Sequence, residues 1–166
     1  ALGANTTGAN NTAIGRDSLL TATTASDNVA VGREAMKRAT DGHSNTAIGT
    51  EALKETTTGD YNVAVGNDAG VAVTTGAENT LLGGDTGTGL TVGIENTFVG
   101  YKAGTHSVAT VNGRFNTLIG SYSKTSAAHT DYAIGIGSDI VAAEGFTTLG
   151  KGVDDIRAAH GNVTWA

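Results

Sequence analysis

The sequence predicts an all-β fold, a β-solenoid of stacked 17-residue coils, and three observations support this prediction. The pentapeptide Asn-(Thr/Val)-x-(Ile/Val/Leu)-Gly occurs seven times, the first six copies starting 17 residues apart and the seventh 20 residues later. A second glycine stands seven residues before the closing glycine in every coil except one, where Ala25 replaces it. Gly, Ala and Thr make up 77 of the 166 residues, too many for an ordinary globular core. The copies span residues 11–15, 28–32, 45–49, 62–66, 79–83, 96–100 and 116–120.

Each pentapeptide predicts a short strand, because β-branched residues alternate within it and glycines bound it. With the second glycine as another corner, we expect two short strands in each coil and positive φ at both glycines. Degenerate copies extend the pattern, so a repeat domain of about nine coils covers residues 1–150. Stacking at about 4.8 Å makes it a rod on the order of 40 Å long. Residues 151–166 leave the repeat, contain Trp165, and are expected to cap the rod or join it to another module.

Alternation along the pentapeptide separates two faces. Asn, the third residue and Gly are small enough for the interior of a thin coil, and we assign the corner to Asn28, Asn45, Asn62, Gly32, Gly49 and Gly66. The fourth residue forms an apolar stripe on the other face, which a narrow coil cannot also enclose. Such a stripe would associate if left in water, so we expect it to form the interface of a homo-oligomer. Its members are Ile14, Val31, Ile48, Val65, Leu82, Val99 and Ile119.

Side-chain volumes support the predicted interior. The third position is Ala in the first four coils and large afterwards, at Leu81, Phe98 and Leu118. Four residues past the closing glycine the order is reversed, with Leu19, Met36 and Leu53 followed by Gly70, Gly87 and Gly104. Close packing demands such an exchange if the two positions face each other across the coil. The fourth coil is small at both positions, so Val71 or Val73 is expected to fill it.

The segments 45–53 and 57–66 resemble the head repeats of trimeric autotransporter adhesins, and more closely the related repeats of bacteriophage tail-fibre proteins. The resemblance covers residues 1–150. It implies a left-handed parallel β-roll in which three chains wind about one axis. It also implies a surface-exposed or virion-borne attachment fibre that works with other fibre or particle proteins and a cell-surface receptor or glycan. A phage tail fibre, an injection-system fibre and a bacterial surface adhesin remain alternatives for the carrier.

Two further files of polar residues recur along the coils. The acidic file could bind cations, but we favour a solvated edge compensated by Arg16 and Arg33, because single-file carboxylates lack a multidentate cage. The asparagine file could present amides to a ligand, but stacked asparagines more often hydrogen-bond each other and the backbone of the corner. The acidic file is Asp17, Glu34, Glu51, Asp68 and Asp85, and the asparagine file adds Asn11, Asn79, Asn96 and Asn116 to the three above.

Composition excludes several classes of function. Cysteine is absent, and the four histidines form no pattern of metal ligands, so we expect no metal and no cofactor. The sequence contains no nucleophile elbow and no phosphate-binding loop, so we expect that the protein is not an enzyme. The net charge of −6 without a basic stripe argues against nucleic acid, and no apolar segment is long enough for membrane insertion. The chain starts at Ala1 and its single Met is Met36, so we expect a processed chain or part of a longer one.

The three-residue insertion between Gly100 and Gly120 is the main departure from the repeat. It places His106, Arg114 and Phe115 on a loop that could bind a receptor, although an insertion tolerated at a surface corner is the commoner explanation. The leading hypothesis is therefore a trimeric attachment fibre located on a virion or at a cell surface. The alternative is a monomeric ligand-binding solenoid, such as a cation-binding protein or an ice-binding one that uses the outward threonines. Val29 and Val63 interrupt that threonine file.

Overall fold

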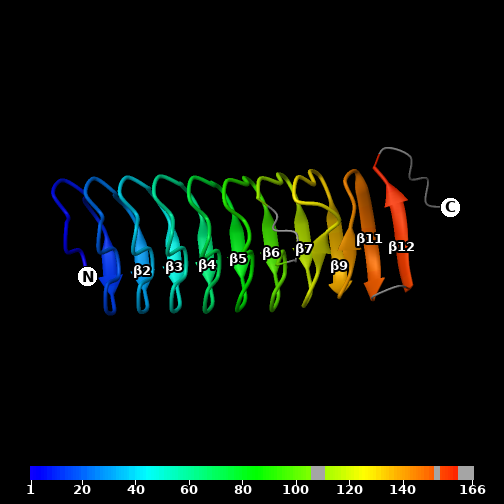
Figure 1. The fold of residues 1–166 in the computed structure, drawn as a ribbon, viewed down its shortest axis with the longest axis horizontal. Coiled ribbons are helices and arrows are strands. Elements are labelled where there is room, and N and C mark those ends of the chain that lie inside the picture. The colour runs from blue at the N-terminus through cyan, green and yellow to red at the C-terminus, as the bar shows by residue number, and fades with distance from the viewer. Residues whose placement is uncertain (106–110, 152–153, 161–166) are drawn as a thin grey trace.

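The computed structural model describes residues 1–105, 111–151 and 154–160, and these form a β-solenoid with coils of about 17 residues. The all-β solenoid predicted from the sequence is confirmed. Parallel strands lie side by side along a rod, with the N-terminal coil at one end and β12 at the other (Figure 1). None of the described residues forms a helix, and so none forms one able to cross a membrane.

Ten strands form the main sheet, and neighbouring parallel strands are paired in register, most of them at a spacing of 17 residues. Ala13 pairs with Ala30, for example, and Leu81 with Phe98. Across the insertion Thr97 pairs with Thr117, and near the C-terminal end Ile134 pairs with Thr147. The last strand, β12 (Asp154–Ala159), is antiparallel to β11 and lies beyond the predicted repeat domain. A small parallel sheet joins β8 (Lys124–Thr125) to β10 (Val141–Ala142). The parallel strands of the main sheet are β1 (Thr12–Ile14), β2 (Val29–Val31), β3 (Thr46–Ile48), β4 (Val63–Val65), β5 (Thr80–Leu82), β6 (Thr97–Val99), β7 (Thr117–Ile119), β9 (Ile134–Ser138) and β11 (Phe146–Lys151).

The prediction of two strands in each coil is wrong for the regular coils. Each has one three-residue strand, and the rest of the described coil consists of turns and bends. The reason is that residues two and four places past the closing glycine adopt positive φ, as at Glu34 (59°) and Met36 (48°). That conformation prevents an extended strand. The turns still bond from coil to coil, since Met36 N donates to Ala52 O at 2.9 Å.

The two glycines of a coil serve different purposes. The closing glycine has positive φ, as predicted, for example 138° at Gly49. The second glycine does not, and that part of the prediction is wrong. At Gly59 a Cβ would lie 2.2 Å from Gly76 O, so the second glycine is needed because the next coil's backbone approaches so closely.

The predicted exchange of large and small side chains is confirmed inside the coils. Leu81 and Phe98 are fully buried. A Cβ at Gly70 would lie 2.6 Å from Leu81 Cδ1, and one at Gly104 would lie 2.2 Å from Phe98 Cδ2, so the two positions share one space. Of the two valines proposed to fill the fourth coil, Val73 is the buried one. The thin interior is therefore filled by pairs of complementary volume.

Candidate functional site

The outward face of the main sheet is one candidate interaction surface, and we call it the strand face. It consists of the first and third residues of β1 to β7 and their register equivalents on β9 and β11. These residues are Thr12, Ile14, Val29, Val31, Thr46, Ile48, Val63, Val65, Thr80, Leu82, Thr97, Val99, Thr117, Ile119, Ile134, Ile136, Thr147 and Leu149. None of them is charged. The face is thus one uninterrupted surface of aliphatic and threonine side chains.

The aliphatic file of the strand face is open to solvent in the single chain. Ile14 is 59% exposed and Val65 37%, and Ile48, Ile119 and Ile136 are also exposed. The other predicted interface residues, Val31, Leu82 and Val99, are half-buried. The file continues onto β12, where Ile156 pairs with Leu149 and is 66% exposed. In water, a patch of this length favours association.

The asparagine file lies inside the coils as a continuous hydrogen-bonded ladder. Asn62 Nδ2 donates to Asn45 Oδ1 at 3.1 Å and to Gly76 O at 2.9 Å. Asn62 Oδ1 in turn accepts from the backbone N–H and the side-chain amide of Asn79. The six asparagines of the file that follow Asn11 are fully buried. Their amides therefore satisfy the backbone at the corner and present no surface to a ligand.

Replacing one rung should therefore destabilise the solenoid. We expect Asn62→Ala to lower the free energy of unfolding by about 2 to 3 kcal/mol, because Asn79 N–H and Gly76 O lose buried partners. Urea denaturation at a fixed chain concentration measures this change. Asn67 is exposed, and its side chain bonds to Asp68 alone among the described residues, so Asn67→Ala is the matched control. Equal stability of the two variants would contradict a structural role for the ladder.

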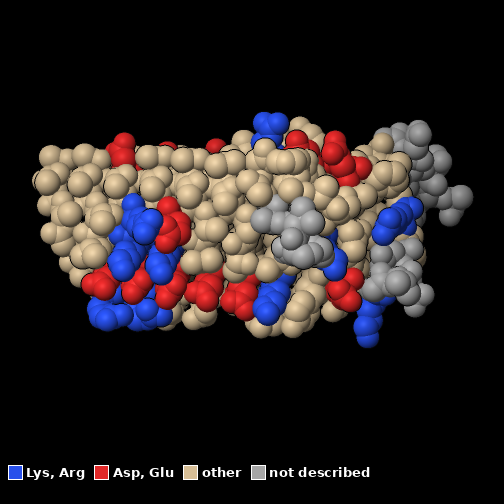
Figure 2. All heavy atoms as spheres, viewed as in Figure 1, with Lys and Arg blue, Asp and Glu red and all other residues tan. Residues whose placement is uncertain are grey.

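The acidic file is compensated by basic side chains in the N-terminal coils. Figure 2 shows these charges gathered toward the N-terminal end of the rod. The Glu34 carboxylate lies within 3.6 Å of four cations, those of Arg16, Arg33, Lys37 and Lys54. The described residues include no group of three His, Cys, Asp or Glu side chains placed to hold a metal ion. The Glu34 ion pairs favour a charge-balanced edge over a cation-binding ladder.

Lys54 is central to this cluster because it bridges two coils. Its ammonium lies 3.2 Å from Glu34 and 3.0 Å from Glu51. Hydrogen bonding to Lys54 lowers the pKa of both glutamates, with partial burial opposing the shift. The same bonds, first that to Glu51, raise the pKa of Lys54. Both glutamates therefore stay ionised to lower pH than usual, and their ion pairs are lost only as the pH falls through the lowered values.

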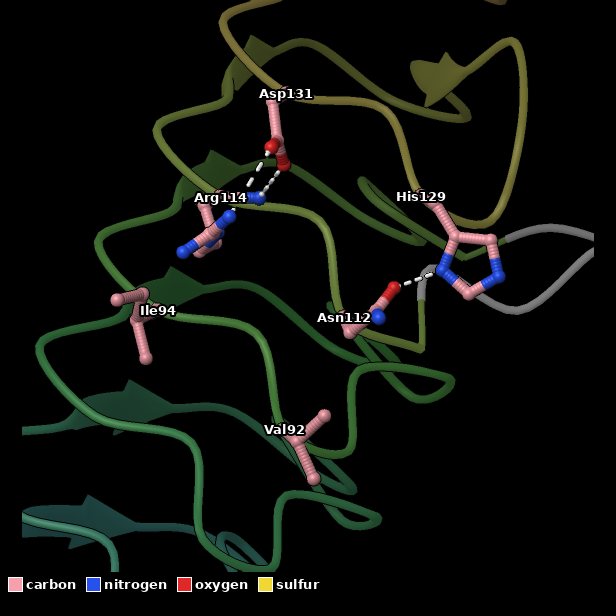
Figure 3. A pocket seen from close by; sticks show the side chains of 6 residues that line it. All are labelled: Val92, Ile94, Asn112, Arg114, His129 and Asp131. Carbon is pink, nitrogen blue, oxygen red and sulfur yellow. Dashed lines mark hydrogen bonds and ion pairs between the residues drawn. The ribbon is translucent and has the colours of Figure 1, made fainter.

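An open groove of about 450 Å³ lies outside the strand face (Figure 3). It is formed by the coil that contains the insertion and by the coils on either side of it. Three consecutive coils each supply two residues. The first gives the aliphatic pair Val92 and Ile94, the second gives Asn112 and Arg114, and the third gives His129 and Asp131.

Hydrogen bonds between coils fix the polar side chains of the groove. Asp131 Oδ1 accepts the backbone N–H of Arg114 at 2.7 Å, and Asp131 Oδ2 lies 3.7 Å from an η-nitrogen of the same arginine. Asn112 Oδ1 contacts His129 Nδ1. The Arg114 side chain remains 54% exposed. Asp131 thus orients Arg114, and His129 orients Asn112. The N–H donors of the Arg114 and Asn112 side chains stay accessible to a ligand.

The three residues of the predicted receptor-binding loop have different placements. Arg114 lines the groove. Phe115 instead stacks on Tyr132, with ring centroids 4.8 Å apart and planes 7° from parallel. His106 lies outside the described residues, as does Trp165 of the predicted cap.

Sequence reasoning missed most of the groove, although the repeat contains a signal for it. The position before the second glycine is Asp at Asp41 and Thr at Thr7, Thr24, Thr58 and Thr75. The three coils around the insertion carry Val92, Asn112 and His129 there, the last of them before Thr130 in place of the glycine. Aligning residues 17 apart also places Arg114 beside Asp131. Comparison with protein-family models, with curated proteins and with solved structures finds no match to this chain.

Proposed function

We propose that this protein is a structural attachment fibre, in which three copies of the chain pack their strand faces around a common axis. The observation that carries the proposal is the strand face itself, uncharged over nine parallel strands. Most of the aliphatic residues that are exposed lie on the strand face or on its continuation onto β12, namely Ile14, Ile48, Val65, Ile119, Ile136 and Ile156. Because every copy of the chain carries the same face, the simplest way to bury it is a closed homo-oligomer in which the copies cover one another's faces.

The attachment role and the trimeric state rest on the resemblance of the repeats to adhesin heads and phage tail fibres. In this proposal the coils wind as a left-handed β-roll, and the fibre belongs to a virion or a cell surface. Its action is mechanical and adhesive and involves no catalysis. Three chains present each binding surface three times, which multiplies a weak affinity. Other fibre or particle proteins would join the rod at its ends.

The second candidate, a monomeric ice-binding or cation-binding solenoid, fits the strand face less well. An ice-binding surface needs regular threonines on both files of a flat sheet. Here the file beside Thr46 and Thr80 is aliphatic, at Ile48 and Leu82, and Val63 interrupts the threonines themselves. The charge-balanced Glu34 cluster likewise gives a cation no vacant carboxylates.

The mass of the protein in solution tests the proposal directly. We expect size-exclusion chromatography with light scattering to give three times the mass of one chain, unchanged on dilution to low micromolar concentration. A stable monomer would overturn the fibre proposal, because it would leave the strand face permanently in water.

A further inference from the structure

We propose that the groove between Val92 and Asp131 binds a saccharide that carries a carboxylate group. This inference deepens the proposed attachment function and rests on it, by naming the class of ligand that the fibre holds. The groove volume of about 450 Å³ lies within the usual range for ligand sites, which is about 300 to 1,000 Å³, and suits a short oligosaccharide.

The groove differs chemically from the same place on the other coils. Its outer file is mostly threonine on the preceding coils, and the threonines beside it bond to the backbone of the next coil, as Thr57 Oγ1 does to Thr74 O. From Val92 onward the file carries an aliphatic residue, an amide and an imidazole. A second file, two residues further along each coil, varies over the whole rod. It reads Ser26, His43, Asp60 and Ala77 in the earlier coils and Ile94, Arg114 and Asp131 at the groove. The described residues of these two files include an arginine only at the groove, where it lies beside an aliphatic pair, an amide and an imidazole.

The free hydrogen-bonding groups of the groove are mainly donors. Asp131 already accepts from the Arg114 backbone and faces its guanidinium, so its oxygens are in use. A guanidinium has five N–H donors, and most of those of Arg114 remain available. With Asn112 Oδ1 held by His129, the Asn112 amide nitrogen can still donate. Convergent arginine and amide donors suit a carboxylate, which accepts two parallel hydrogen bonds.

The other side chains of the groove favour a ligand that has hydroxyl groups and an apolar surface in addition to a carboxylate. When His129 Nδ1 donates to Asn112, its Nε2 accepts, and a ligand hydroxyl can supply that proton. Val92, 43% exposed, and Ile94 offer an aliphatic surface on the neighbouring coil. A ligand that combines a carboxylate, hydroxyl groups and an apolar C–H face is an acidic sugar. Figure 3 shows these side chains arranged around one opening, supplied by successive coils.

The experiment titrates the full chain with four sugars and one plain acid, followed by ligand-observed saturation-transfer NMR. The acidic probes are 3′-sialyllactose and trigalacturonic acid, the neutral probes are lactose and maltotriose, and sodium acetate supplies a carboxylate without a sugar. We expect at least one acidic sugar to bind at least tenfold more tightly than the neutral sugars and acetate. Absence of binding by both acidic sugars at 10 mM, or equal binding of neutral sugars or acetate, would overturn the proposal.

Two variants locate the binding. Arg114→Ala should weaken it at least tenfold, and Asn112→Asp, which keeps the shape of the side chain but adds a negative charge, should do the same. Arg38→Ala is the matched control, because Arg38 is similarly exposed and makes one ion pair, with Glu55. Binding that survives both groove variants would place the site elsewhere and refute the assignment.

The oligomeric mass of the same samples separates the two proposals. A trimer that binds no acidic sugar would overturn the groove assignment and leave the fibre intact. A monomer that binds the sugar through Arg114 would overturn the fibre proposal and leave the groove as the ligand site of a monomeric solenoid.

Discussion

Val65→Asp should abolish the trimer. Val65 lies near the middle of the strand face, 37% exposed in one chain and flanked in register by Ile48 and Leu82. In the proposed assembly each chain would bring one carboxylate into an apolar interface without a cation, which costs about 3 to 5 kcal/mol for an uncompensated buried charge. We expect light scattering to show monomer or mixed aggregates at concentrations where the native chain is trimeric.

Thr58→Asp is the control for the added charge. Thr58 is exposed and lies on the bends away from the main sheet, and the equivalent residue of the preceding coil is already an acid, Asp41. This variant should remain trimeric with an unchanged melting temperature. If Val65→Asp also kept its trimeric mass and its melting temperature, the strand face could not be the interface.

Much of the fold could be predicted because the pentapeptide that forms each strand of the regular coils recurs at an almost constant spacing. The 17-residue spacing therefore determines which residues pair, and Ala47 aligns with Ala64 as the sequence indicates. The absence of a second strand from the regular coils could not be predicted from the spacing. Such a strand is prevented by positive φ at residues such as Glu51 and Leu53, which are not glycines and carry no local signal for that conformation. Contacts with neighbouring coils hold them there.

The strand face and the groove differ in how far the sequence predicts them. Alternation within the pentapeptide places Ile48 and Val65 on one side of a strand, so the outward stripe follows from the motif. The groove lies on bends outside the motif, and its parts are far apart in sequence. Asn112 and His129 meet only because 17 residues make one turn, and the openness of the space between them depends on side-chain packing that spacing does not specify.

Gly66→Ala should strongly destabilise the solenoid. Gly66 has a φ of 142°, a conformation that residues with a Cβ rarely adopt. A Cβ there would also lie 2.4 Å from Gly83 O and 2.6 Å from Gly83 C, both of which belong to the backbone of the next coil. Backbone strain and overpacking together should lower the free energy of unfolding by about 4 kcal/mol, measured by urea denaturation.

Gly84→Ala is the matched control in the neighbouring coil. Gly84 follows the closing glycine, its φ is not positive, and a Cβ there would lie 3.5 Å from Tyr101 Cδ2, an ordinary contact. Other coils carry Arg33 or Thr50 at this position, so a methyl group fits without strain. We expect this variant to unfold within about 0.5 kcal/mol of the native protein. Comparison at one chain concentration is essential, because association contributes to stability in an oligomer. If both variants lost a similar amount of unfolding free energy, neither the φ of Gly66 nor the close approach of the next coil could be the reason for glycine at this position.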